Sequence, residues 1–320
     1  MTFTAGRATI PCLHRKTEKS YMRETEVQQY VKPEHVAARL KKLHPGAVVT
    51  QGRLETKVKG HILDSEWGVF DLIHRVHVHH TYPNFIPLLS SKDVSVLITP
   101  WGRLPIFFQV ATSRVGPAAY QQTFSIFGVL YCHQVSQMTQ EGDEVRVTMS
   151  WFLVSHWLFK WMHYLFDKRL ARLQKEQGEE DAPLRERRWE LRKRGIRFVT
   201  DQPDFINAND MSDHVILPPM ALPLRIPLTH IADGKCQDVS AGPLELLVRK
   251  QADAWTVWPA LCPHEGAKLG EEHLCENRLT CPWHGRAFGP TNLLQRGGAP
   301  LRYLGLNIQR DGDDLVVSAG

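Results

Sequence analysis

The sequence has no long apolar run. No stretch reaches the about 18 residues that a membrane-spanning helix needs, and residues 1–7 lack the apolar core of a secretory signal. Cysteine is also scarce: the chain has six, irregularly spaced at positions 12, 132, 236, 262, 275 and 281. So few cysteines argue against a disulfide scaffold. These absences favour a cytoplasmic protein whose cysteines are buried residues or metal ligands.

Strong charge of one sign is absent too. The net charge is only +5, with 42% hydrophobic and 23% charged residues, as in an ordinary globular protein. Part of the positive charge comes from one local run, so nothing here indicates a nucleic-acid partner. A length of 320 residues is enough for two domains, each with a core of its own.

Shifts in composition divide the chain into four parts. We expect an N-terminal extension over residues 1–45, a mixed domain over 46–200, a linker rich in Pro, Asn and Asp over 201–222, and an all-β domain over 223–320. The fold class is therefore α+β. The predicted elements are a helix at 33–43, a strand at 50–62, a helix from residue 65, strands at 120–137 and 144–154 joined by a turn at 141–143, and a long helix at 157–175.

The all-β part contains two short motifs separated by sixteen residues: Cys262-Pro263-His264 and Cys281-Pro282-Trp283-His284. An iron–sulfur cluster with two thiolates on one iron and two imidazoles on the other needs one of each from two loops. Gly266 and Gly285 follow the motifs and would let the loops pack closely. Zinc is the rival metal. The β-rich surroundings and the proline after each cysteine argue against it, because a zinc finger would carry its histidines on a helix.

The two loops, CPHEG and CPWHG, resemble those of the Rieske [2Fe–2S] family, and the similarity covers about residues 224 to 320. Trp283 stands where the respiratory members carry an extra cysteine, and Cys275 lies outside both motifs. The pattern therefore resembles the low-potential clusters of oxygenases and their ferredoxins. The pair Cys12-x-His14 has no matching second motif, and we interpret it as a chance pair.

The mixed domain, a curved antiparallel sheet closing around a long helix, resembles the START-like (SRPBCC) helix-grip fold. Rieske oxygenases use this fold for a mononuclear iron held by two histidines and a carboxylate. Their motif matches Asp71, His74 and His79. The resemblance implies that the histidines bind iron and that Asp71 orients an imidazole or relays electrons. On an ideal helix His79 would lie about 140° from His74, so the helix must unwind there. His77 is the rival second ligand and His80 a less favoured one.

The carboxylate of the family comes from a late helix, where this sequence has Asp181. The separation between His79 and Asp181 is shorter than the family pattern suggests. An alternative is that Pro183 begins a helix and Asp181 only caps it. Asp167 or Glu180 could serve as the third ligand instead.

The resemblance implies a Rieske non-haem iron oxygenase with its domain order reversed. Such an enzyme holds a [2Fe–2S] cluster and a mononuclear Fe(II), takes electrons from a ferredoxin or flavin reductase, and uses dioxygen to oxidise a hydrophobic organic substrate. In this family the cluster of one subunit typically serves the iron of its neighbour, which implies a homo-oligomer such as a trimer. Two alternatives stay open: a Rieske electron-transfer protein, and a START-like lipid- or polyketide-binding protein.

Three further expectations concern side chains around these sites. A substrate cavity could be lined by Phe107, Phe108, Phe124, Phe127, Trp151 and Phe152. The apolar stretch 157–166 is expected to cover the sheet, with peripheral membrane contact as the alternative. The run 185–197 has seven basic residues and is either a solvated face or, through Arg188 and Arg192, a docking surface for an acidic ferredoxin.

Overall fold

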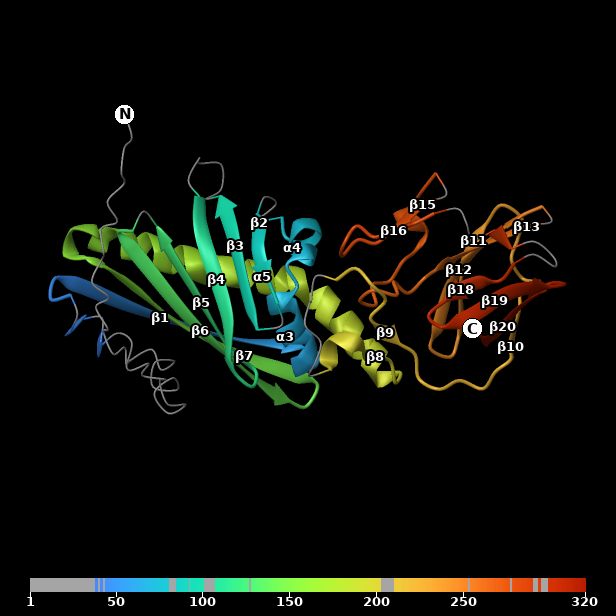
Figure 1. Cartoon of the computed structure of the whole chain (residues 1–320), viewed down its shortest axis with the longest axis horizontal. Helices are drawn as coiled ribbons and strands as arrows, with labels where there is room; N and C mark the ends of the chain where they lie inside the picture. Colours follow the sequence, from blue (N-terminus) through green and yellow to red (C-terminus); the bar gives the residue numbers. More distant parts are fainter. Residues whose placement is uncertain are drawn as a thin grey trace, which may run out of the picture.

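The computed structural model describes residues 38–320 except 40, 43, 81–84, 92, 101–106, 127, 203–209, 253, 277, 290–292 and 295–298. Its described part consists of an N-terminal body built on one large sheet and a C-terminal body built from small sheets (Figure 1). Cys12, His14 and Phe127 lie outside the described residues, and so does most of the helix expected at 33–43.

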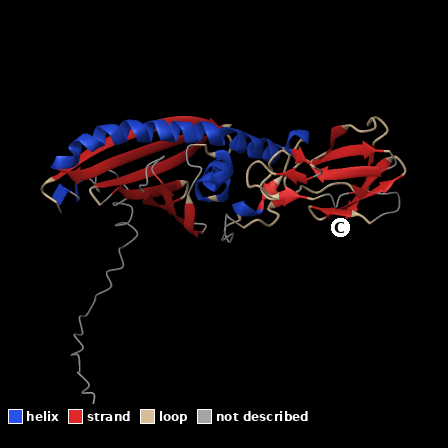
Figure 2. Cartoon of the chain, turned by 90° about the horizontal axis from the view of Figure 1, so that it is seen from above, coloured by secondary structure: helices blue, strands red, loops and turns tan. Residues whose placement is uncertain are grey.

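The N-terminal body is an antiparallel sheet of seven strands in the order β1-β7-β6-β5-β4-β3-β2. The strands are β1 (Ala47–Lys59), β2 (Ile86–Ser90), β3 (Val94–Pro100), β4 (Phe107–Gly116), β5 (Ala119–Ile126), β6 (Leu130–Glu141) and β7 (Glu144–His156). Two short helices, α3 (Ile62–Phe70) and α4 (Ile73–Val78), stand between the first two strands. After the last strand come a 3-10 turn, η1 (Trp157–Phe159), and the long helix α5 (Lys160–Lys193), which lies along the sheet (Figure 2).

This order of elements confirms the helix-grip expectation. The predicted starts of β1, α3, β7 and α5 lie within three residues of the observed ones, whereas β2, β3, β4 and α4 had no predicted bounds. The predicted strand at 120–137 is two strands, β5 and β6, and the hairpin is formed by β6 and β7. Gly142, with φ of +62°, makes its turn. Alternate side chains of β7 are buried from Val145 to Trp151, as a strand with one face against a helix requires. Those side chains, including Val145, Val147 and Met149, pack against Phe166 and Leu170 of α5.

Helix α5 differs most from expectation. It runs through Pro183 without a break, so the predictions that the helix ends near residue 175 and that Asp181 caps a new helix are wrong. A proline inside a helix costs about 3 kcal/mol. Burial of α5 on both sides of Pro183 offsets this cost: Phe166 and Leu170 pack on the sheet, and Leu184 and Leu191 pack where the two bodies meet.

The start of α5 covers the sheet with one stripe only. Met162, Phe166 and Leu170 face the core, because residues four apart lie on one side of a helix. Five neighbouring side chains are more than half exposed: Trp157, Leu158, Trp161, Tyr164 and Leu165. Among the described residues, none of the helices combines the length and apolar character needed to span a bilayer.

The C-terminal body holds two four-stranded sheets. One has the order β10-β20-β19-β18, formed by β10 (Leu224–Pro227), β18 (Leu301–Tyr303), β19 (Leu306–Asp311) and β20 (Asp314–Ala319). The other has the order β11-β12-β13-β17, formed by β11 (Cys236–Ala241), β12 (Leu244–Gln251), β13 (Ala254–Pro259) and β17 (Leu293–Leu294). Trp255, Val248 and Val317 belong to the core that joins them.

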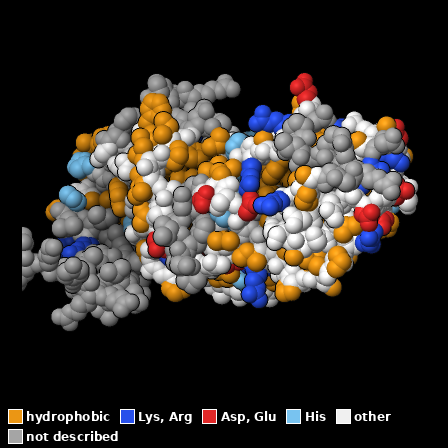
Figure 3. Space-filling view, turned by 45° about the vertical axis from the view of Figure 1, so that its right-hand side comes forward, with side chains coloured by type: hydrophobic (Ala, Val, Ile, Leu, Met, Phe, Trp, Pro, Cys, Tyr) orange, Lys and Arg blue, Asp and Glu red, His pale blue; other side chains and the backbone are white. Residues whose placement is uncertain are grey.

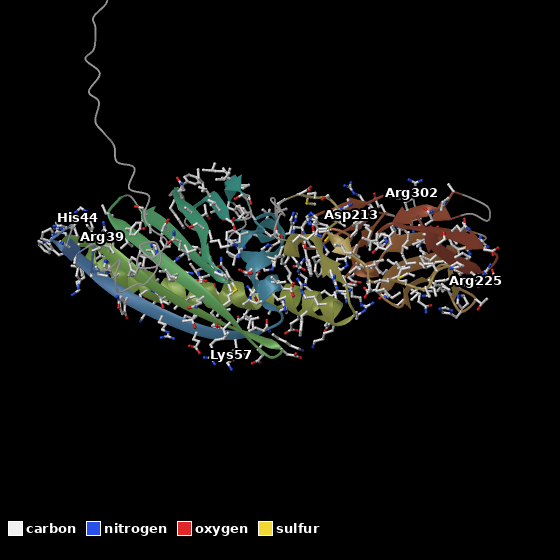
Figure 4. All side chains as sticks on the ribbon, turned by 60° about the horizontal axis from the view of Figure 1, so that its bottom comes forward. Arg39, His44, Lys57, Asp213, Arg225 and Arg302 are labelled. Carbon is white, nitrogen blue, oxygen red and sulfur yellow. The ribbon has the colours of Figure 1, made fainter. Side chains whose placement is uncertain are left out.

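A three-stranded sheet carries the second motif. It consists of β14 (Leu274–Cys275), β15 (Arg278–Thr280) and β16 (Ala287–Phe288), after the 3-10 turn η3 (Glu271–His273). Cys281 follows β15 directly, whereas Cys262 follows shortly after β13. The segment that links the two bodies includes β8 (Arg197–Phe198), η2 (Val199–Asp201) and β9 (Val215–Ile216). Asp213, in this segment, lies on the side of the C-terminal body that faces the N-terminal one (Figure 4) and pairs with Arg286 at 2.7 Å.

The basic run is part of the contact between the two bodies. Arg188 is fully buried and pairs with Asp64 of α3 and with Glu265 of the first motif. Arg192 contacts Asp64 at 2.8 Å and Asp201 at 2.7 Å. Neither a solvated face nor a docking surface formed by Arg188 and Arg192 agrees with this burial, so both expectations for these two residues are wrong. The sequence could not show it, because Asp64 and Glu265 lie 124 and 77 positions from Arg188.

Candidate metal centres

The two cysteine–histidine motifs form loops of the same geometry. In each, the cysteine N–H donates to the carbonyl five residues later, from Cys262 to Ala267 and from Cys281 to Arg286, both at 2.8 Å. Each loop is also closed by a glycine N–H that donates to the cysteine carbonyl at 2.9 Å. The matching geometry brings the two rings of His264 and His284 together, with centroids 4.4 Å apart.

The donor atoms of the loops converge. The Nε2 atom of His264 bonds the Asp210 carbonyl at 2.8 Å, and that of His284 bonds Asp71 at 2.6 Å. Their Nδ1 atoms are buried and have no hydrogen-bond partner among the described residues. A hydrogen bond from Cys262 lowers the pKa of the Cys281 thiol, so the two sulfurs lie next to each other. Buried nitrogens without partners beside a thiol pair fit the two-thiolate, two-imidazole set of a [2Fe–2S] cluster.

The glycine after each motif is required because the loop lies too close to the N-terminal body for a side chain. Gly266 and Gly285 have φ of +83° and +67°, a region that favours glycine. A Cβ on Gly266 would lie 2.6 Å from Leu191, and one on Gly285 would lie 2.7 Å from His77. The loops therefore pack directly against the N-terminal body. His77 is exposed and packs on the second loop.

A second set of donors lies in the N-terminal body. His74 is buried in α4, and His79 caps the end of that helix in an extended conformation, so the helix does end before His79. The Nε2 atoms of His74 and His79 lie 3.4 and 3.3 Å from Oδ1 of Asp181. These three atoms lie within 4.8 Å of one another. The structure thus brings together the two histidines and the carboxylate that the sequence suggested.

The neighbours of His79 and Asp181 bond the atoms that point away from the centre of this donor set, so the atoms that point inward are available to a metal. Nδ1 of His79 bonds Glu180 at 2.7 Å, and Oδ2 of Asp181 bonds Arg185 at 2.8 Å. Nε2 of His74 and Oδ1 of Asp181 are buried and have no hydrogen-bond partner among the described residues. Burial raises the pKa of Asp181, but the charge of Arg185 and the contact with His74 outweigh it and hold this pKa well below its usual range. Two imidazoles and an ionised carboxylate fit a facial iron site.

Asp71 connects the two sets. It is fully buried in the break between α3 and α4, where it caps the end of α3. Its Oδ2 accepts the 2.6 Å bond from His284 and lies 3.5 Å from Nδ1 of His74. Burial raises the pKa of Asp71, but the charge and hydrogen bond of His284 outweigh it and keep Asp71 ionised. One carboxylate therefore contacts a histidine of each candidate centre within a single chain.

The remaining alternatives from the sequence lie elsewhere. His80 is exposed, and Asp167 accepts a 2.8 Å bond from Trp151. Glu180 contacts His79 at the nitrogen that faces away from Asp181. Sequence reasoning missed Glu265, which bonds His214 at 2.6 Å and pairs with Arg188. Its only signal was its place within the first motif.

A cavity of about 130 Å³ opens beside His79. Phe108 and Phe124 line it as expected, with their rings 5.6 Å apart. Trp151 and Phe152 are buried in the sheet, and Phe107 is exposed. Hydrophobic side chains also gather on one face of the N-terminal body (Figure 3).

The two loops with their converging donors define an iron–sulfur module. Residues 226–299 match the Rieske [2Fe-2S] domain family, so this part of the chain is a Rieske domain, which implies a [2Fe–2S] cluster and a redox role. A comparison with curated proteins finds no significant match.

Among solved structures, the chain is similar to norcoclaurine synthase from Thalictrum flavum, with 12% identity over 42% of this chain and 87% of that one, at a TM-score of 0.35. It is also similar to the Zhui aromatase/cyclase of Streptomyces sp. R1128, with 8% identity over 34% of this chain and 69% of that one, at 0.29. A third similar structure is the di-domain aromatase/cyclase StfQ from the steffimycin biosynthetic pathway. It has 10% identity over 53% of this chain and 60% of that one, at a TM-score of 0.38.

Proposed function

We propose that this chain is a Rieske non-haem iron oxygenase. It takes electrons from a ferredoxin or flavin reductase and uses dioxygen to oxidise a hydrophobic organic substrate bound beside His79. We propose Cys262, His264, Cys281 and His284 as the cluster ligands, and His74, His79 and Asp181 as the ligands of a mononuclear iron.

The contact of Asp71 with both His284 and His74 carries this proposal. A protein that only carries electrons, or only binds a ligand, has no need of a buried carboxylate between its cluster loop and a second set of converging donors. Burying a charge is costly unless it is paired. Electron transfer from a redox module to a second redox metal would explain why a charged carboxylate is buried between the two donor sets.

The residues of the chain have distinct parts in this proposal. When bound, the cluster supplies one-electron transfer and a ferrous ion supplies dioxygen activation. Asp71 accepts a hydrogen bond from Nε2 of His284, which fixes that ring with Nδ1 toward the cysteines. Glu180 fixes the ring of His79 in the same way. The apolar wall of the cavity holds the substrate and limits the access of water.

Iron and sulfide quantitation on the purified chain tests the proposal. We expect three irons per two acid-labile sulfides. Two irons per two sulfides in protein reconstituted with excess Fe(II) would contradict it, and would favour the electron carrier or the START-like binding protein.

The position of Asp71 further implies that both centres of one working unit belong to the same chain. In the resembling family the two centres typically come from neighbouring subunits, and we propose that here they do not. Mixing a Cys262→Ser protein with a His79→Ala protein should therefore restore no substrate-dependent oxygen consumption. Recovery near the level that randomly mixed subunits allow would show that neighbouring subunits supply the two centres.

The remaining parts of the proposal concern the surroundings. We propose a cytoplasmic location. A homo-oligomer such as a trimer stays a prediction, and the pairing of both centres within one chain does not require it. The electron donor docks at a surface other than Arg188 and Arg192, since both side chains are engaged between the two bodies.

A further inference from the structure

Arg75, at the wall of the cavity, is a cation for which the described residues supply no counter-ion. It lies in α4 between His74 and His79 and is partly buried. Its Nη2 donates to the Val69 carbonyl at 3.2 Å, and its buried Nε has no hydrogen-bond partner among the described residues. It forms no ion pair with any carboxylate in the described part of the chain. Other arginines of this body, such as Arg114 and Arg185, do pair with acidic residues.

The rest of the cavity wall divides into an apolar and a polar side. The apolar side includes Phe85, Leu97, Phe108, Phe124, Phe166 and Leu170. The polar side holds Arg75 and Arg169 with neutral amides, and the described lining residues include no aspartate or glutamate. The wall thus combines aromatic and aliphatic surface with positive charge.

Three of the four amides of the polar side donate hydrogen bonds to neighbouring polar side chains. Gln174 donates to Gln134 at 3.3 Å, Gln134 donates to Ser136 at 3.3 Å, and Gln122 donates to Thr112 at 3.2 Å. These bonds fix a neutral polar wall and use amide N–H groups within it. They leave Arg75 as a charged donor that a ligand can engage.

The size of the cavity limits what fills it. Its volume of about 130 Å³ is close to the about 150 Å³ of an apolar cavity that binds benzene. One aromatic ring therefore fits the apolar side. A carboxylate on that ring would give Arg75 the anion that it lacks, and a guanidinium binds a carboxylate well because its donors match the two oxygens.

We propose that the cavity binds a single-ring aromatic carboxylate, with the ring against Phe108 and Phe124 and the carboxylate on Arg75. That this ligand is the substrate rests on the function proposed above. A cationic ligand is disfavoured by Arg75 and Arg169. A neutral ring would leave the positive charge of Arg75 partly buried and unpaired, at a cost that an anion removes.

Binding measurements with three probes test this inference. Benzoate, benzamide and benzylamine share one ring and differ in charge. We expect calorimetry on the metal-loaded chain to show benzoate binding about tenfold or more tighter than benzamide, since a hydrogen bond to a charged group contributes more than a neutral one. Benzylamine should not bind detectably.

Variants locate the charge that is responsible. Arg75→Met should lose the preference for benzoate over benzamide while keeping its iron content. Arg172→Met is the matched control: this arginine of α5 is exposed, pairs with Glu176 and lies outside the cavity lining. It should bind benzoate like the parent chain. Unchanged benzoate affinity in Arg75→Met would show that the metal, and not Arg75, holds the carboxylate, and would overturn the inference.

The comparison of probes on the unaltered chain needs no variant to fold. Equal binding of benzamide and benzoate, tighter binding of benzylamine, or no binding of any probe would each overturn the inference. These outcomes are separate from the test of the oxygenase. If the chain holds two irons and still prefers benzoate through Arg75, the anion site stands and the oxygenase proposal fails. If it holds three irons and shows no such preference, the oxygenase proposal stands and the anion site fails.

Discussion

Removal of the Arg188 guanidinium tests how the two bodies are held together. This side chain is fully buried, donates to Asp64 at 2.9 Å and to Thr200 at 3.2 Å, and pairs with Glu265. Its guanidinium also lies 3.6 Å from the ring centroid of Phe198. Since Glu265 belongs to the first cluster loop and Asp64 to α3, Arg188 joins the cluster module to the N-terminal body.

The size of the effect follows from what Arg188→Met leaves behind. Breaking a buried ion pair typically costs about 3–5 kcal/mol, because the remaining charge is buried and uncompensated. Here Asp64 keeps Arg192 and Glu265 keeps His214, so we expect the low end, about 3 kcal/mol. For domains of this size that corresponds to a fall in Tm of about 6–12 °C.

Urea unfolding followed by circular dichroism, together with thermal scans, measures this loss. Lys193→Met is the matched control, because Lys193 and Asp143 are 44% and 66% exposed and such a pair contributes little. The control should change the free energy of unfolding by less than about 0.5 kcal/mol. If Arg188→Met proves no less stable than Lys193→Met, the buried network does not hold the bodies together and the reasoning fails.

Three further predictions concern the metal centres. Cys262→Ser or His284→Ala should lose the visible absorption and the EPR signal of the reduced cluster, since each removes one of four ligands; an undiminished signal would refute the assignment. His79→Ala should lose about one iron per chain and keep the Rieske spectrum, whereas His77→Ala should keep all three irons, and the opposite pattern would show that the second ligand is His77. Asp71→Asn should keep both metals in elemental analysis yet slow the reoxidation of the reduced cluster by oxygen in the presence of substrate, because the charged contact between His284 and His74 is lost; parent-like reoxidation would exclude Asp71 as the connection.

The cluster loops could be predicted from short stretches of the sequence. The ligand spacing of a Rieske loop is set by neighbours in the sequence, since one backbone turn must present a thiolate and an imidazole together, and a glycine must follow at positive φ. Gly266 and Gly285 were therefore recognisable before any fold was known. Strands β1 and β7 of the N-terminal body could likewise be predicted, because alternating burial follows from strand geometry.

The second donor set was only partly visible. His74, Asp71 and the need for a break before His79 could be inferred, because they lie in one short segment. Asp181 stayed one of several carboxylates, and its proline neighbour favoured a cap. The continuous α5 overrides that local preference through packing on both sides of Pro183.

The sequence by itself determined the two ligand loops and the starts of β1, α3, β7 and α5, since these depend on residues a few positions apart. The tertiary structure alone decided that Asp71 contacts His284, 213 positions away, and that Arg188 meets Asp64 and Glu265. It also decided that no carboxylate of the described residues pairs with Arg75. Whether a charge is buried and paired depends on residues brought together by folding. Nothing in the local pattern of a basic run or a lone arginine carries that information.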